Sequence, residues 1–138
     1  MTTYGTMLTK HNITIPDHIL EDAEVPVLTG AQRQGDVGIF PITKTTLKNF
    51  EPIPLGGVQV VRGEAGGHTH WLDGDGSVEY APAGQRDGSM LLGELRVGEG
   101  SAAYLTHEDE HGSNAIGPGM YTFHSKREQA DEIRRVTD

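Results

Sequence analysis

Cysteine is absent from this chain of 138 residues, which excludes both disulfide bonds and thiolate metal ligands. Any metal that the chain binds must therefore be held by imidazole nitrogen or by oxygen. Aromatic residues make up only 6% of the chain and hydrophobic residues 35%, so the expected core is small. The length fits one domain that can bury such a core without cross-links.

Basic residues are also scarce. The chain has 11 lysines and arginines against 20 acidic residues, which gives a formal net charge of -9. A surface of this sign repels nucleic-acid phosphates and anionic lipids, so we expect neither nucleic acid nor a membrane as a partner. The opening MTTYGTMLTKHN lacks the basic and apolar segments of a signal peptide. We therefore expect a soluble protein that is intracellular, or that is made in a cytosol and then assembled into a larger structure.

Glycine, in contrast, is abundant. The 19 glycines and 7 prolines favour short strands joined by tight turns over a helical bundle. We expect a mainly β fold, an antiparallel meander that forms a small barrel or sandwich over residues 35–125. Turn sequences such as DGDG, GEG and IGPG separate the expected strands, which are 35–42, 56–64, 77–82, 89–97, 101–107 and 119–125.

The two ends of the chain differ from its middle. Residues 1–34 carry scattered apolar residues without periodicity, which predicts an extended N-terminal arm lying on its own domain or on a neighbour. Such an arm is too poor in apolar groups to stay in place unless a companion chain holds it. In the tail, Ser125 precedes Glu128 by three residues, a capping-box spacing that predicts a short C-terminal helix over 126–138.

Two histidine pairs are the strongest candidates for a site. His68 and His70 in GEAGGHTH stand one residue apart, and in a strand such residues point to the same face. His107 and His111 in LTHEDEHG are four residues apart, a spacing that lets both imidazoles face one point. If the pairs meet, they form a site for a divalent transition metal such as zinc or iron. The alternative is that both pairs are polar loop residues.

The segment DGDGSVE places acidic and hydroxyl side chains at alternate positions, as at the start of a calcium-binding loop. The match then ends, because Val78 stands where such a loop needs glycine and Gly84 where it needs glutamate. Asp-Gly is also common turn chemistry, so we interpret this segment as a hairpin turn.

A first resemblance concerns the histidines. GHTH followed by IGPGMYTFH resembles the cupin pattern, in which His-x-His on one strand and a later histidine bind one metal. The resemblance implies His68, His70 and His124 as ligands, with Glu79 as the acidic ligand. In this chain Glu79 follows His70 by nine residues, which is further than cupins place their glutamate.

A second resemblance runs from about Gln34 to the C-terminus. QGDVGIFPI, GEAGGHTH, LTHEDEHG, PGMY and KREQADEIRRVTD are similar to motifs of a family of small uncharacterised proteins from actinobacteria and their phages. The resemblance implies a phage-encoded protein. In that setting, a short acidic β domain with an extended arm resembles a capsid decoration protein or a tail accessory protein.

Two functions stay open at this point. We favour a non-catalytic structural or accessory protein of a phage virion, which docks through its arm onto further copies of itself, the major capsid protein or another virion protein. The alternative is a metal-binding module or a cupin-like enzyme that uses the four paired histidines. The chain has neither a nucleophile elbow nor a phosphate-binding glycine loop, so no catalytic residues are assigned.

Overall fold

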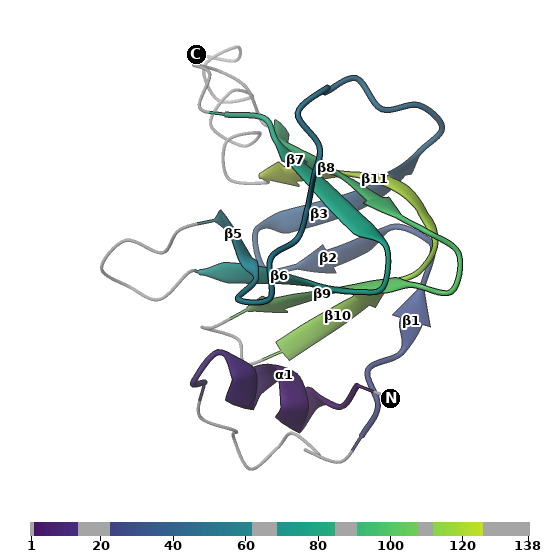
Figure 1. Ribbon diagram of the computed structural model, residues 1–138. Coiled ribbons are helices and arrows are strands. Elements are labelled where there is room, and N and C mark those ends of the chain that lie inside the picture. The colour runs from purple at the N-terminus through teal and green to yellow at the C-terminus, as the bar shows by residue number, and fades with distance from the viewer. Residues whose placement is uncertain (1, 14–22, 62–68, 85–90, 108–111, 126–138) are drawn as a thin grey trace.

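Two β-sheets packed face to face make up most of the structure, a computed structural model that describes residues 2–13, 23–61, 69–84, 91–107 and 112–125 (Figure 1). The five-stranded sheet contains, in spatial order, β1 (Val27–Leu28), β10 (Gly112–Ile116), β9 (Ala102–His107), β6 (His70–Asp75) and β5 (Val58–Val61). The six-stranded sheet contains β2 (Gln32–Gln34), β3 (Val37–Ile42), β11 (Gly119–Ser125), β8 (Leu91–Val97), β7 (Val78–Pro82) and β4 (Glu51–Pro52).

The chain builds these sheets from antiparallel pairs that alternate between them. The β5–β6 pair belongs to the five-stranded sheet, β7–β8 to the six-stranded sheet, and β9–β10 to the five-stranded sheet again. Among the described strands, β1 is the exception, because it runs parallel to β10. The prediction of a mainly β, antiparallel sandwich is therefore confirmed, and the two sheets do not close into a barrel.

The main core lies between the two sheets, where every second residue of a strand points inward. In β9 and β6 these residues include Leu105 and Leu72, which are opposite each other in the ladder and fully buried. In β11 of the facing sheet they are Tyr121 and Phe123. Strands that pack on one face show this alternation in sequence, which is why most of them could be expected from it.

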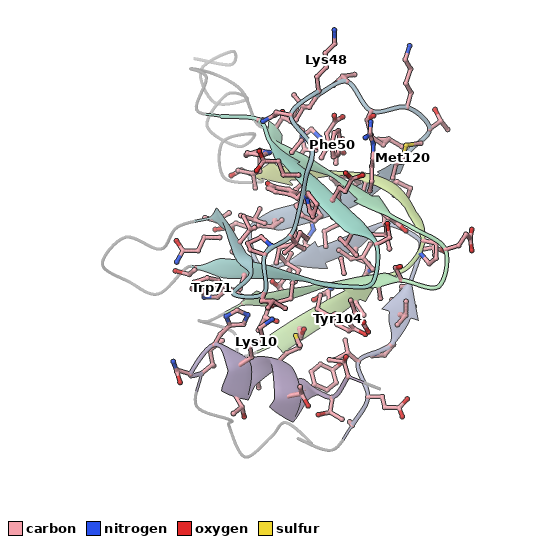
Figure 2. The ribbon with its side chains drawn as sticks, viewed as in Figure 1. Lys10, Lys48, Phe50, Trp71, Tyr104 and Met120 are labelled. Atoms are coloured by element: carbon pink, nitrogen blue, oxygen red, sulfur yellow. The ribbon has the colours of Figure 1, made fainter. Side chains whose placement is uncertain are left out.

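A second, smaller core covers the outer face of the five-stranded sheet. There the helix α1 (Tyr4–Lys10) packs through Met7 on Tyr104 of β9 and Ala115 of β10 (Figure 1). Because this face is covered as well, all six residues of β9 are buried. Figure 2 shows Tyr104 directed toward the helix.

The beginning of the chain differs from the expected extended arm. Its described residues include α1, and they pack on the chain's own sheet. The sequence carried a signal for this helix: Thr3 caps it by accepting a hydrogen bond from the backbone of Thr6, and Tyr4, Met7 and Leu8 share one helical face. Within PDHILEDAE, residues 16–22 lie outside the described part of the chain, as does the helix expected over 126–138.

A buried polar contact fastens the end of α1 to the sheet. His11, just after the helix, stacks on Trp71 of β6 with ring centroids 4.6 Å apart, and its Nε2 donates a hydrogen bond of 2.6 Å to Asp73 Oδ2. Lys10 Nζ lies 2.6 Å from the other carboxylate oxygen of Asp73. Gly57 permits the adjacent loop to close over this group, since a Cβ there would lie only 2.8 Å from the same oxygen. Figure 2 shows Lys10 and Trp71 at the same end of the helix.

We predict that His11→Ala lowers the free energy of unfolding by about 2 kcal/mol, because it removes a buried hydrogen bond to a carboxylate together with a ring stack. Urea unfolding followed by the fluorescence of Trp71, the single tryptophan, measures this loss. Lys10→Ala is the control and should lose no more than about 1 kcal/mol, because the Lys10 side chain is 36% exposed. Equal losses in the two variants would contradict the assignment.

Candidate metal centre

Two histidines meet inside the sandwich. His70 and His107 are directly opposite each other in the ladder between β6 and β9. Their rings are stacked, with centroids 3.9 Å apart and planes within 6° of parallel. They are exposed to only 2% and 3%, so the two imidazoles are as buried as the apolar core beside them.

The position of this pair follows from strand alternation. His70 begins β6 and His107 ends β9, and because the strands are antiparallel these two ends coincide. Each histidine is two residues from a core leucine, Leu72 or Leu105, and therefore shares that leucine's inward face. The pair thus extends the main core toward one end of the five-stranded sheet.

A buried glutamine from the facing sheet contacts the pair. Gln34 of β2 is exposed to only 4%, and its Oε1 lies 2.9 Å from His70 Nδ1. Its Nε2 donates to the backbone oxygen of Leu105 at 2.6 Å and to Asn114 Oδ1 at 2.9 Å. Gln34 therefore joins the six-stranded sheet to β9 and β10 of the other sheet at the place where the histidines lie.

One member of each predicted histidine pair is thus at the centre of the site. His68 and His111, the other two residues of the predicted metal set, lie outside the described residues. Within the part of the chain that the structure describes, no three histidine, cysteine or acidic residues come together as a metal cluster. The described part of the chain therefore provides two possible metal ligands, His70 and His107, and a complete metal site would need further ligands.

The residues implied by the cupin resemblance do not join this pair. His124 on β11 and Glu79 on β7 alternate with core residues of the six-stranded sheet, so they lie on its outer face, while His70 and His107 point into the core. His124 instead has an edge-to-face contact with Phe40, which is 40% exposed. The cupin ligand set of His68, His70, Glu79 and His124 is therefore a wrong prediction for Glu79 and His124.

Two buried acidic residues, Asp73 and Glu94, hold other segments of the chain against the sheets. Asp73 of the DGDGSVE segment points to the α1 face, where it binds His11 and Lys10, and the segment continues β6 before the turn at Gly76, whose φ is +89°. The expected turn is therefore present, but the hairpin interpretation is wrong, because β6 and β7 on either side of the turn belong to different sheets. The buried Glu94 of β8 accepts hydrogen bonds from the backbone of Thr46 and Leu47, which holds that loop against the sheet.

Sequence reasoning missed Gln34 and Asn114. Gln32 and Gln34 in the segment QRQ stand at the strand spacing of two residues, which places both amides on one face. That spacing was the available signal, but glutamine on a short strand is more often exposed. β10, which carries Asn114, was also missed because GSNAI has little β propensity.

The fold and the site together define a two-sheet β sandwich with a stacked histidine pair in its interior. The chain belongs to the family described as Domain of unknown function (DUF8820), whose model matches residues 33–126. The matched range includes both histidines and Gln34, and it begins after α1. The expectation of a family without an assigned activity is thereby confirmed. No curated protein and no solved structure matches the chain. In the described residues, no helix is long and apolar enough to cross a lipid bilayer.

We predict a pH dependence from His124. Partial burial lowers the pKa of His124 from its ordinary value of 6.5, because desolvation disfavours the charged imidazolium. Below that pH the unfolded chain therefore takes up the proton before the folded chain does, and the free energy of unfolding falls. Urea titrations between pH 7.5 and 5, chosen as about one pH unit and more on either side of the ordinary pKa, should show a shallower fall for His124→Gln. Identical slopes in both proteins would refute this role.

Proposed function

We propose that this chain is a metal-binding module that holds a divalent transition metal through His70 and His107. The observation that carries the proposal is the meeting of two buried imidazoles at the ends of two neighbouring strands, with ring centroids 3.9 Å apart. The rings are parallel and their nitrogen lone pairs lie in the ring planes, so one ring must turn about its side-chain torsions for both nitrogens to reach one ion. Imidazole nitrogen suits zinc, iron, nickel and copper, and the chain has no thiolate that would compete for them.

The burial of the polar ring nitrogens supports the same proposal. Apolar residues would fill the same space without any polar nitrogen to satisfy, which makes a purely structural use of two histidines the weaker explanation.

The described residues give two ligands, and the candidates for further ligands come from the sequence. A structural zinc site has four protein ligands and a catalytic site three, so the proposal needs at least one further donor. His68 and His111 are the candidates from their sequence positions, two residues before His70 and four after His107. Nothing in the described residues assigns a substrate, so the proposal is metal binding rather than a named reaction.

We predict that metal-free protein binds zinc chloride with a stoichiometry of one, as measured by isothermal titration and by elemental analysis after dialysis. His70→Ala and His107→Ala should each weaken binding by more than about tenfold, since even outer-shell changes have effects of that size. His124→Ala is the matched control, because it removes a histidine from the outer face, and it should bind as the unaltered chain does. His68→Ala and His111→Ala, measured separately, then identify the further ligands.

Two results would contradict the proposal. One is the absence of zinc, copper, nickel and iron binding in the unaltered protein. The other is binding that is weakened equally by His124→Ala and His107→Ala, which would indicate scattered surface histidines. Bound metal should also raise the free energy of unfolding, by about 2.7 kcal/mol at a concentration one hundred times the dissociation constant.

The structural or accessory role in a phage virion stays a prediction. Its main argument was an arm that needs a companion chain, and the described residues of that segment pack on their own sheet. One feature still favours contact with another chain: Val27 and Leu28 of β1, at the edge of the five-stranded sheet, are each 51% exposed. The phage origin rests on the motif resemblance alone.

If this edge mediates self-association, the double variant Val27→Lys and Leu28→Lys should shift the protein to a smaller species in sedimentation velocity. Charged side chains on an edge strand oppose pairing with another chain. The variant Leu55→Lys is the control, because Leu55 is 95% exposed but lies outside the strands. A monomer in the unaltered protein at all concentrations would exclude self-association through this edge.

A further inference from the structure

The side-chain amide of Gln34 has a defined orientation. Its nitrogen lies 2.6 Å from the backbone oxygen of Leu105, and a backbone carbonyl can only accept a hydrogen bond. If the amide were rotated by half a turn, its oxygen would face that carbonyl at the same distance, and the two acceptors would repel each other. The nitrogen must therefore face Leu105, and the oxygen must face His70.

Asn114 gives the same answer independently. Its Nδ2 donates to Gln32 Oε1 and, at 3.4 Å, to the backbone oxygen of Arg33, so its Oδ1 is the atom turned toward Gln34. An amide oxygen at 2.9 Å again requires the nitrogen of Gln34 on that side. Two neighbours, one of them a main-chain group, therefore agree on the orientation of one amide.

The orientation of the Gln34 amide determines which ring nitrogen of His70 carries a proton. The oxygen of Gln34 lies 2.9 Å from His70 Nδ1 and can only accept, so Nδ1 must carry the proton. In a neutral imidazole the lone pair is then on Nε2, because only one ring nitrogen is protonated. The ring plane is held as well, since this hydrogen bond lies in it and the ring also stacks on His107.

We infer that Gln34 is the positioning residue of the metal centre: it fixes the tautomer and the plane of His70, so that Nε2 is the nitrogen that binds the metal. This inference rests on the proposed function. A hydrogen bond from the second nitrogen is the usual means by which proteins orient a metal-binding histidine. An uncharged amide does this without adding a negative charge, so the site is suited to a borderline nitrogen-seeking cation such as Zn²⁺, Cu²⁺ or Ni²⁺ and not to Ca²⁺ or Mg²⁺.

The tautomer can be measured without any metal. Long-range ¹H–¹⁵N correlation spectra of the metal-free protein at neutral pH should show His70 protonated at Nδ1, with Nε2 as the pyridine-like nitrogen. The assignment comes from the loss of these signals in His70→Ala. A spectrum with His70 protonated at Nε2 would overturn the inference, whether or not the protein binds metal.

The role in binding is tested with two matched glutamines. Gln34→Leu should lower the affinity for Zn²⁺ by about 10-fold to 100-fold, the range seen when an outer-shell partner of a metal ligand is removed. Gln32→Leu is the control: Gln32 is on the same short strand, and its amide bonds Asn114 and the backbone of Ala115, but it has no hydrogen bond to His70. It should destabilise the sandwich and leave the affinity within about twofold, which is a small change in binding free energy.

The outcomes separate the two proposals. If the tautomer is as inferred and no transition metal binds, the proposed function fails while the orientation of His70 by Gln34 stands. If zinc binds and both leucine variants lose affinity equally, Gln34 acts only through stability, and the positioning role is refuted. Should Gln34→Leu not fold, the spectrum of the unaltered protein still decides the tautomer, and Ca²⁺ and Mg²⁺ titrations test the cation class.

Discussion

The complete hydrogen bonding of one buried glutamine is the constraint on which the arrangement around the histidines depends. Gln34 stands in the six-stranded sheet, and its amide is bonded to groups on β6, β9 and β10 of the other sheet. A buried amide that loses a partner destabilises the fold by about 1–3 kcal/mol. The two sheets are consequently held at one mutual position near the histidines, where a slide of either sheet would break several hydrogen bonds at once.

Strand β6 connects this interior site to the outer face of its sheet. His70 points inward to His107, and the next residue, Trp71, points outward to the stacked ring of His11. Asp73 continues the outward row and binds the end of α1. The end of the helix, Lys10, and the next residue, His11, therefore lie on the back of the strand that carries the site, while the body of the helix packs on β9 and β10.

The beginning of the chain forms a helix that depends on contacts with distant strands. Thr3 and the spacing of Tyr4, Met7 and Leu8 are helix signals, but a helix of seven residues is too short to be stable alone. It exists because Met7 finds Tyr104 and Ala115, residues about a hundred positions later in the chain. The scattered apolar residues of this segment predicted an extended arm, but in the structure Tyr4, Met7 and Leu8 lie on one face of α1.

The strands were easier to predict where turn sequences bound them. β3, β7, β8, β9 and β11 were expected within a few residues of their observed bounds, and β11 also shows the burial of every second residue at Tyr121 and Phe123. β9 is buried on both faces and shows no alternation, but the turns that flank it were sufficient to predict it. β10 carries small and polar residues and was missed. Short edge strands such as β1 and β4 contain two residues each, too few for any periodic signal.

The sequence by itself determined the β-rich character, the separation into short strands and the chemistry of the donors, because composition and residue type are local properties. It also determined that His68 and His70, or His107 and His111, stand near each other along the chain. Only the tertiary structure decided that His70 faces His107, that His124 and Glu79 lie on another face, and that Gln34 orients the ring. The register between distant strands places these groups, and register depends on the packing of whole faces rather than on any one segment.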